Sequence, residues 1–294
     1  MKTSVNAGNL RAALLCAMAL CLTSCASWQP GWKAAQAPAV SGDAKQLLLA
    51  AEALEEKADD GPKVAGLIDA YKAVVAADPG NYRALWKIGN YHILMGAAYS
   101  PKNGDRKRNY TEAVKYCEKA MYTNQAFKAA VDRGEPVWKA VEVLTAAEVE
   151  AMGYWYTARF YYFKECLCPL GRLFNTGLVR YNEPVMKRID VLDPNWAGGG
   201  NLFSRAVYFI AAPERFGGSK KKAEEYMAKA IEVGPDYLVN RWGRAKYLYS
   251  LTGNKAGYEA DLKWVLAQDP HKAPNPYPWN VYFQRQAAEM LAGK

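Results

Sequence analysis

The sequence predicts an all-α fold of about 10–13 helices, paired as hairpins in a repeat solenoid. Apolar residues recur at three- and four-residue steps, as at Ala223, Met227 and Ala230, which is the spacing of one helix face. Four amphipathic stretches end at a proline, namely Pro79, Pro194, Pro235 and Pro270. No stretch of useful length alternates apolar and polar residues, so no strand is expected.

The stretch 216–237 displays the repeating unit most clearly. Ser219 can cap a helix because its hydroxyl accepts from a free first-turn N–H group, and Gly234-Pro235 ends that helix. The small, large and small residues Ala223, Met227 and Ala230 match the second helix of a tetratricopeptide repeat. The interval from Pro235 to Pro270 is close to the roughly 34-residue period of that repeat.

The other helices follow from the same periodicity. Helices are expected over 44–57, 63–77, 82–98 and 110–121, with a polar turn over 99–109 and an irregular section over 124–143. Thr145 and Glu148 form a capping box that opens an aromatic helix to about residue 164, and this helix should be central because most of its faces are apolar. Later helices are expected over 181–192, 199–212, 220–233, 236–251 and 254–268, and from about residue 279.

The first 24 residues are typical of a lipoprotein signal peptide. Lys2 and Arg11 flank an apolar run over 12–22, which is too short to span a bilayer. The run ends in Leu-Thr-Ser-Cys25, so Cys25 is the expected lipidation site; an ordinary secretory signal with an incidental cysteine is the alternative. The predicted organisation is a signal peptide over 1–24, a lipidated tether over 25–42 and a helical repeat domain over 43–294.

Charge and motif content argue against nucleic acid binding and catalysis. The formal net charge is +9, but the basic residues are interspersed with acids and form no compact cluster with aromatics, so no nucleic acid partner is expected. His92 and His271 have no metal-ligand neighbour at helical spacing, and phosphate-loop and nucleophile motifs are absent, so we expect no metal, no cofactor and no enzymatic activity. Cys117 could pair with Cys166 or Cys168, or all three could be free thiols.

Five segments occur in one order: Trp155-Tyr-x-Ala-Arg159, Val191-Leu-Asp-Pro194, Trp196-Ala-Gly-Gly, Phe216-Gly-Gly-Ser, and the stretch 258–270. This order resembles the TRAP transporter T-component (TatT-like) family of tetratricopeptide-repeat periplasmic lipoproteins. The resemblance implies a lipid anchor, a periplasmic solute-binding protein as partner, and a homotrimer with a pore through each protomer. Asn201 departs from the pattern, because members of the family often carry His in this segment. Ala26 after the lipidated cysteine favours the periplasmic side of the outer membrane.

The candidate binding residues lie on the first helices of the later repeats, which conventionally line the concave surface of a solenoid. Arg159 and Arg205 lie within apolar runs, where an unpaired charge is costly, so each either meets an acid of the fold or binds a carboxylate in a wet cavity. A buried core helix is the alternative for the aromatic helix itself. The candidate ligand- or partner-binding residues are Trp155, Arg159, Tyr162, Asn201, Arg205, Tyr208 and Arg241.

Two functions are compatible with the sequence. The first is a non-enzymatic accessory of a TRAP-type system that docks the solute-binding protein and passes an organic acid or hydrophobic ligand. The alternative is a general repeat scaffold for the assembly of envelope complexes.

Overall fold

The computed structural model describes residues 28–34 and 42–293, and this part of the chain is helical with no strand. The first half forms η1 (Gly31–Lys33), α2 (Ala44–Glu55), α3 (Gly61–Ala77), α4 (Tyr82–Tyr99), α5 (Asn103–Tyr122), α6 (Gln125–Asp132), α7 (Val137–Ala140), η2 (Val141–Val143), η3 (Ala146–Glu148) and α8 (Val149–Tyr161). The second half forms η4 (Tyr162–Cys166), α9 (Pro169–Phe174), α10 (Gly177–Arg180), α11 (Asn182–Leu192), α12 (Trp196–Ala211), η5 (Glu214–Phe216), α13 (Lys220–Val233), α14 (Leu238–Gly243), η6 (Arg244–Tyr249), α15 (Ser250–Thr252), α16 (Lys255–Ala267) and α17 (Tyr277–Leu291). The all-α prediction is confirmed, although short segments divide the chain more finely than the expected 10–13 helices.

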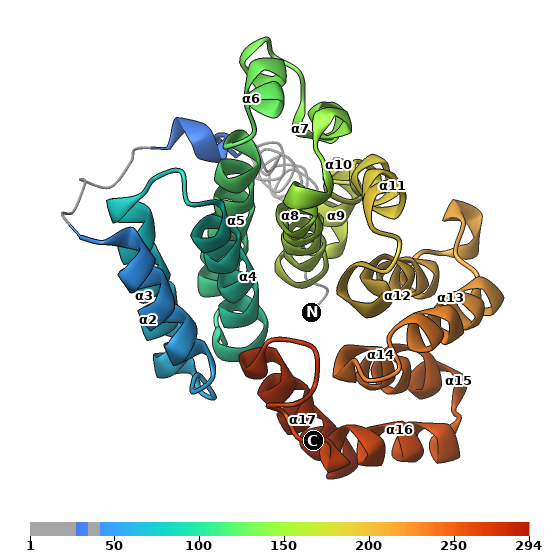
Figure 1. Ribbon diagram of the computed structural model, residues 1–294. Coiled ribbons are helices and arrows are strands. Elements are labelled where there is room, and N and C mark those ends of the chain that lie inside the picture. The colour runs from blue at the N-terminus through green and yellow to red at the C-terminus, as the bar shows by residue number, and fades with distance from the viewer. Residues whose placement is uncertain (1–27, 35–41, 294) are drawn as a thin grey trace, which may run out of the picture.

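Consecutive helices pack as pairs in a curved row, which Figure 1 shows from α2 in blue to α17 in red. The expected start of α13 is present, since the Ser219 hydroxyl accepts from the Lys222 N–H group. Ala223, Met227 and Ala230 are fully buried, as the repeat pattern predicts. Ala230 packs against Gly199 of α12. A Cβ added at Gly199 would lie only 3.1 Å from the Ala230 Cα atom.

Helix α8 is central, as its aromatic content predicts. The capping box of Thr145 and Glu148 is formed, and it opens the 3-10 turn η3 that leads into α8. Helix α8 packs against α4, α5 and α11, and Trp155 and Tyr156 are almost fully buried. Its last turn widens into the π-helix η4 before Cys168-Pro169 starts α9.

Three local predictions differ from the structure. The polar turn over 99–109 is mostly helical, because α5 already begins at Asn103 and is supported by an ion pair between Asp105 and Arg108 at 2.8 Å. The glycine-rich break lies within α12, where Ala197, Gly198 and Gly199 adopt positive φ angles and the regular helix follows. Helices α9 and α10 were not expected from the sequence.

The predicted tether is not free along its whole length. Residues 28–34 pack against the helical body, and the Gly31 N–H group donates to Glu118 Oε2 of α5 at 2.7 Å. A Cβ at Gly31 would lie 2.0 Å from the Lys115 carbonyl oxygen, so only glycine fits this approach. The predicted signal peptide, Cys25 and the rest of the tether lie outside the described residues.

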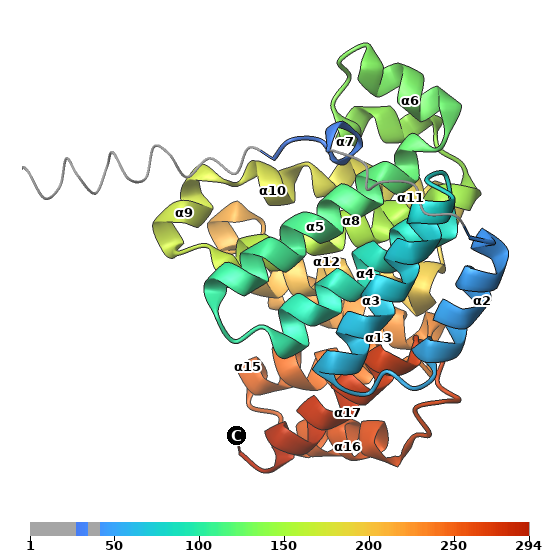
Figure 2. The same cartoon turned by 90° about the vertical axis from the view of Figure 1, so that its left-hand side faces the viewer.

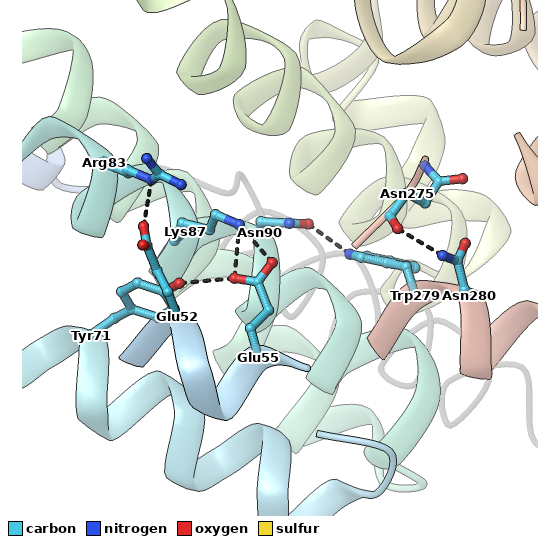
Figure 3. A network of polar contacts seen from close by, with 9 residues as sticks. All are labelled: Glu52, Glu55, Tyr71, Arg83, Lys87, Asn90, Asn275, Trp279 and Asn280. Atoms are coloured by element: carbon cyan, nitrogen blue, oxygen red, sulfur yellow. Dashed lines mark hydrogen bonds and ion pairs between the residues drawn. The ribbon is translucent and has the colours of Figure 1, made fainter. Parts of the chain in front are cut away.

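The last helix returns to the beginning of the row and closes it. The Trp279 indole of α17 donates to Asn90 Oδ1 of α4 at 2.7 Å, as Figure 3 shows. Beside this contact, the Lys87 ammonium group of α4 pairs with Glu55 of α2 at 2.7 Å, and Glu55 also accepts from the Tyr71 hydroxyl of α3. The three cysteines in the described part of the chain, Cys117, Cys166 and Cys168, are free thiols.

Candidate functional site

A cavity of about 580 Å³ lies between α8, the N-terminal segment and the loop that precedes α7. Aromatic rings form much of its wall, contributed by Trp28, Trp32, Trp138, Trp155, Phe174 and Tyr181. Its charged lining residues are Lys33, Glu118, Glu135 and Arg159. The site therefore combines large apolar surfaces with a few charged groups, which is the usual composition of a small-molecule site.

Arg159 is the cation at the inner wall of this cavity. It lies four residues after Trp155 on α8, so both side chains share one helix face, and its guanidinium lies 4.3 Å from the centre of the Trp155 ring. It donates to the Gly177 carbonyl at 2.9 Å and to Asn182 Oδ1 at 3.3 Å. No carboxylate among the residues that the structure describes lies within ion-pair distance of it. Burial lowers the pKa of Arg159 to about 10, so the group remains a cation at neutral pH.

Glu118 of α5 contacts Trp155 at the N–H edge of its indole ring. Its carboxylate accepts from the Trp155 indole N–H at 3.0 Å and from the Gly31 N–H at 2.7 Å. Burial raises the pKa of Glu118 above its ordinary value, although both hydrogen bonds oppose the shift. Glu118 thus orients Trp155 and the N-terminal segment. Its charge raises the pKa of Arg159 against the effect of burial, but the two side chains form no ion pair in direct contact.

The N-terminal segment supplies the outer aromatic wall. Trp28 meets Tyr162 edge-on, with ring centres 5.0 Å apart, and lies 5.9 Å from the Arg159 guanidinium. Trp32 stacks on Tyr122 at 5.4 Å and meets Phe127 edge-on. Of the predicted binding residues, Trp155, Arg159 and Tyr162 are thus brought together around Trp28.

Arg205 and Asn201 occupy a different environment between α11 and α12. Arg205 pairs with Asp190 at 2.6 Å and with Glu183 at 3.6 Å. Burial alone would lower the pKa of Arg205, but the hydrogen bond and charge of Asp190 raise it. Asn201 donates to Asp190 Oδ1 and accepts from the Tyr156 hydroxyl, both at 2.8 Å. Of the two alternatives for Arg205, these contacts favour pairing with acids of the fold over binding of a ligand carboxylate.

Arg241 and Tyr208 also lie apart from the cavity lining. Arg241 pairs with Asp261 at 3.4 Å, and its guanidinium lies over the Trp264 ring. Asp261 also accepts two hydrogen bonds of 2.7 Å from the neighbouring Arg244. Tyr208 is an exposed residue on α12 whose ring contacts Phe209 edge-on. The geometry therefore assigns Arg241 to the packing of α14 on α16.

Sequence reasoning missed Trp28, Trp32 and Glu118. Two tryptophans four residues apart, with a glycine between them, were a usable signal, because a free linker gains nothing from two large apolar side chains. Sequence reasoning also missed a recurring amide: Asn240 donates to the carbonyls of Gly198, Ala230 and Gly234, and Asn280 makes three similar bonds within its own preceding loop. Such amides fix the turns between successive helices.

Two further observations concern metal binding and membrane spans in the described residues. They contain no group of three or more His, Cys, Asp or Glu side chains that could hold a metal ion. Within 28–34 and 42–293, no helix is both long and apolar enough to cross a membrane.

The family described as TRAP transporter T-component matches residues 99–294, two thirds of the chain, and this range includes the whole of α5 and α8 and everything that follows. A search of curated proteins finds no significant match. Since the matched range contains most of the helical body, the chain belongs to the TRAP transporter T-component family.

Proposed function

We propose that this protein is a non-enzymatic periplasmic accessory of a TRAP-type transport system. In this proposal it docks the periplasmic solute-binding protein, receives an amphipathic organic acid in the cavity at Arg159, and passes it on. The signal peptide over 1–24 is removed, and acylated Cys25 anchors the helical domain to the periplasmic side of the outer membrane.

The observation that carries the ligand assignment is the environment of Arg159. No carboxylate of the described residues contacts this half-buried guanidinium, and the Glu118 charge acts on it only at a distance, so an anion in direct contact would stabilise it further. Its remaining donor capacity and its position over the Trp155 ring favour an anionic group at one end of a ligand. The indole and phenyl rings of the lining favour an apolar body at the other end. An organic acid with an alkyl or aromatic portion has both features.

The ligand assignment can be tested before the ligand itself is identified. Native mass spectrometry of protein purified from its own envelope should detect an added mass, and extraction should identify a carboxylic acid. Arg159→Gln should lose this mass. Arg285→Gln is the matched control, because Arg285 also lies over an aromatic ring, Tyr99 at 4.8 Å, but does not line the cavity. Equal retention by both variants would remove Arg159 from the binding site.

Docking is tested separately. The acylated protein is isolated from envelopes under mild conditions, and its partners are identified by mass spectrometry. A TRAP solute-binding protein should be recovered in near-stoichiometric amount, and light scattering should report a homotrimer, which the family resemblance supports. Recovery of a varied set of envelope proteins without any TRAP component would instead favour the general scaffold. Intact mass of the same preparation tests acylation at Cys25.

A further inference from the structure

Helix α9 presents an apolar turn to solvent. Leu170, Leu173 and Phe174 are 46%, 64% and 55% exposed, and they lie at positions i, i+3 and i+4, so they share one helix face. Figure 2 shows α9 projecting from one end of the molecule, next to α10 and the beginning of α5. Three large exposed apolar side chains within five residues form a patch that monomeric proteins usually cover.

Basic residues border this patch. The Asn103 side chain at the start of α5 donates to the Cys166 carbonyl at 3.2 Å, so the first turns of α5 lie beside the segment that leads into α9. Lys102, Lys107 and Arg108 are exposed on these turns, and Asp105 is the acid among them. Arg180 at the end of α10 is exposed as well. An apolar face bordered by lysine and arginine is the combination that anionic lipid surfaces attract.

The beginning of the described chain fixes where a membrane would lie. Trp28 contacts Tyr162 of η4, the segment immediately before α9, and Phe174 of α9 lines the same cavity as Trp28. Cys25 precedes Trp28 by three residues, which span at most about 10 Å when fully extended. Acyl chains on Cys25 therefore bring the bilayer to the end of the molecule where α9 projects.

We propose that α9 lies on the bilayer surface, with Leu170, Leu173 and Phe174 inserted among the headgroups and the basic residues of α5 and α10 against anionic lipid. The anchor and α9 then form two contacts with the membrane and fix the orientation of the helical body. The cavity at Arg159 faces the lipid interface in this orientation, because Phe174 belongs both to its lining and to the apolar face. This inference rests on the lipid anchor of the proposed function.

The test uses the mature chain, residues 25–294, with Cys25→Ser, so that only the protein surface binds lipid. Cosedimentation with vesicles of phosphatidylethanolamine and phosphatidylglycerol should show binding that weakens with added salt and with neutral vesicles. The triple variant Leu170→Gln, Leu173→Gln and Phe174→Gln should weaken binding at least tenfold. The control triple variant Val191→Gln, Leu251→Gln and Leu266→Gln removes other exposed apolar side chains and should bind like the parent.

Circular dichroism and thermal unfolding of both triple variants check that each is folded. A second variant, Lys102→Gln with Lys107→Gln, should reduce the salt dependence of vesicle binding while leaving the apolar face intact. Absence of vesicle binding by the parent chain, or equal binding by the α9 variant, would overturn the inference. Loss of self-association in the α9 variant without any change in vesicle binding would assign the face to contacts between copies. Acylation of Cys25 and recovery of the solute-binding protein are measured in separate experiments, and their failure would contradict the proposed function and not the lipid binding of α9.

Discussion

Gly31→Ala is expected to release the N-terminal segment from the helical body while leaving the body folded. An added Cβ would lie 2.0 Å from the Lys115 carbonyl oxygen and 2.7 Å from its carbonyl carbon, and both belong to the backbone of α5. Ordinary contact begins at 3.4 Å, so the segment must move by more than 1 Å. A movement of that size stretches the 2.7 Å hydrogen bond from Gly31 to Glu118 beyond its effective range.

The size of the effect follows from the lost hydrogen bond. A bond to a charged group contributes about 1.5–3 kcal/mol, which is roughly a tenfold to 150-fold change in the equilibrium between docked and open segment. Displacement of the Trp32–Tyr122 stack adds about 0.5–1.5 kcal/mol. Hydrogen exchange measured by mass spectrometry on peptides covering residues 28–34 should therefore accelerate at least tenfold, while exchange in α3 and α4 is unchanged.

The control is Gly66→Ala in the middle of α3, where an added Cβ meets nothing within 4 Å. This change should leave exchange at 28–34 untouched and stabilise α3 by about 0.5–1 kcal/mol, since alanine has the higher helix propensity. Native exchange at residues 28–34 in Gly31→Ala would contradict the close backbone approach on which this part of the site depends.

The other predictions concern the stability of the helical body. Ala230→Leu should lower the free energy of unfolding by about 1–3 kcal/mol in denaturant titration, because Ala230 is fully buried against Gly199, whereas the exposed control Lys222→Leu should change it little; equal shifts would argue against the repeat register. Lys87→Met should cost about 3–5 kcal/mol by leaving Glu55 buried without its cation. The control Lys63→Met, at an exposed ion pair with Asp59, should change the free energy of unfolding little; similar losses for the two variants would mean that Glu55 is satisfied by Tyr71 alone. Burial lowers the pKa of His92 below its ordinary 6.5, so the stability that neutral His92 contributes is fully present above pH 6.5 and is lost as the pH falls through the lowered pKa. His92→Gln should therefore reduce the change of the free energy of unfolding with pH between pH 5 and 7. An unchanged slope would show that other groups titrate in this range.

Much of the all-α fold was predictable because many of its helices carry their own local signals. The burial of Ala223, Met227 and Ala230 follows from their three- and four-residue spacing, and the central place of α8 follows from its aromatic residues. The start of α5 was predicted too late in the chain because a polar, charged stretch is compatible with both a loop and an exposed helix. In such a stretch the choice depends on local pairs such as Asp105–Arg108.

The candidate site was only partly predictable. Trp155 and Arg159 could be selected because a tryptophan and an arginine on one face of an apolar helix need special partners. Arg205 gave the same sequence signal, since it also lies within an apolar run, and only its ion pair with Asp190 distinguishes it from Arg159. Asp190 lies on the neighbouring helix α11, whereas the neighbouring α10 offers Arg159 only the Gly177 carbonyl. Tertiary contacts therefore decide which arginine forms an ion pair.

The central claim is that Arg159 receives the carboxylate of an amphipathic acid, and calorimetric titration with matched probes tests it most directly. The probes are straight-chain and phenyl-substituted carboxylates together with the corresponding alcohols, titrated into the parent protein, Arg159→Gln and the control Arg285→Gln. We predict that the parent and the control bind the acids more tightly than the alcohols, and that Arg159→Gln loses this preference at least tenfold, as expected for a charged hydrogen bond. Equal affinities for acid and alcohol in the parent, or an unchanged preference in Arg159→Gln, would contradict the claim.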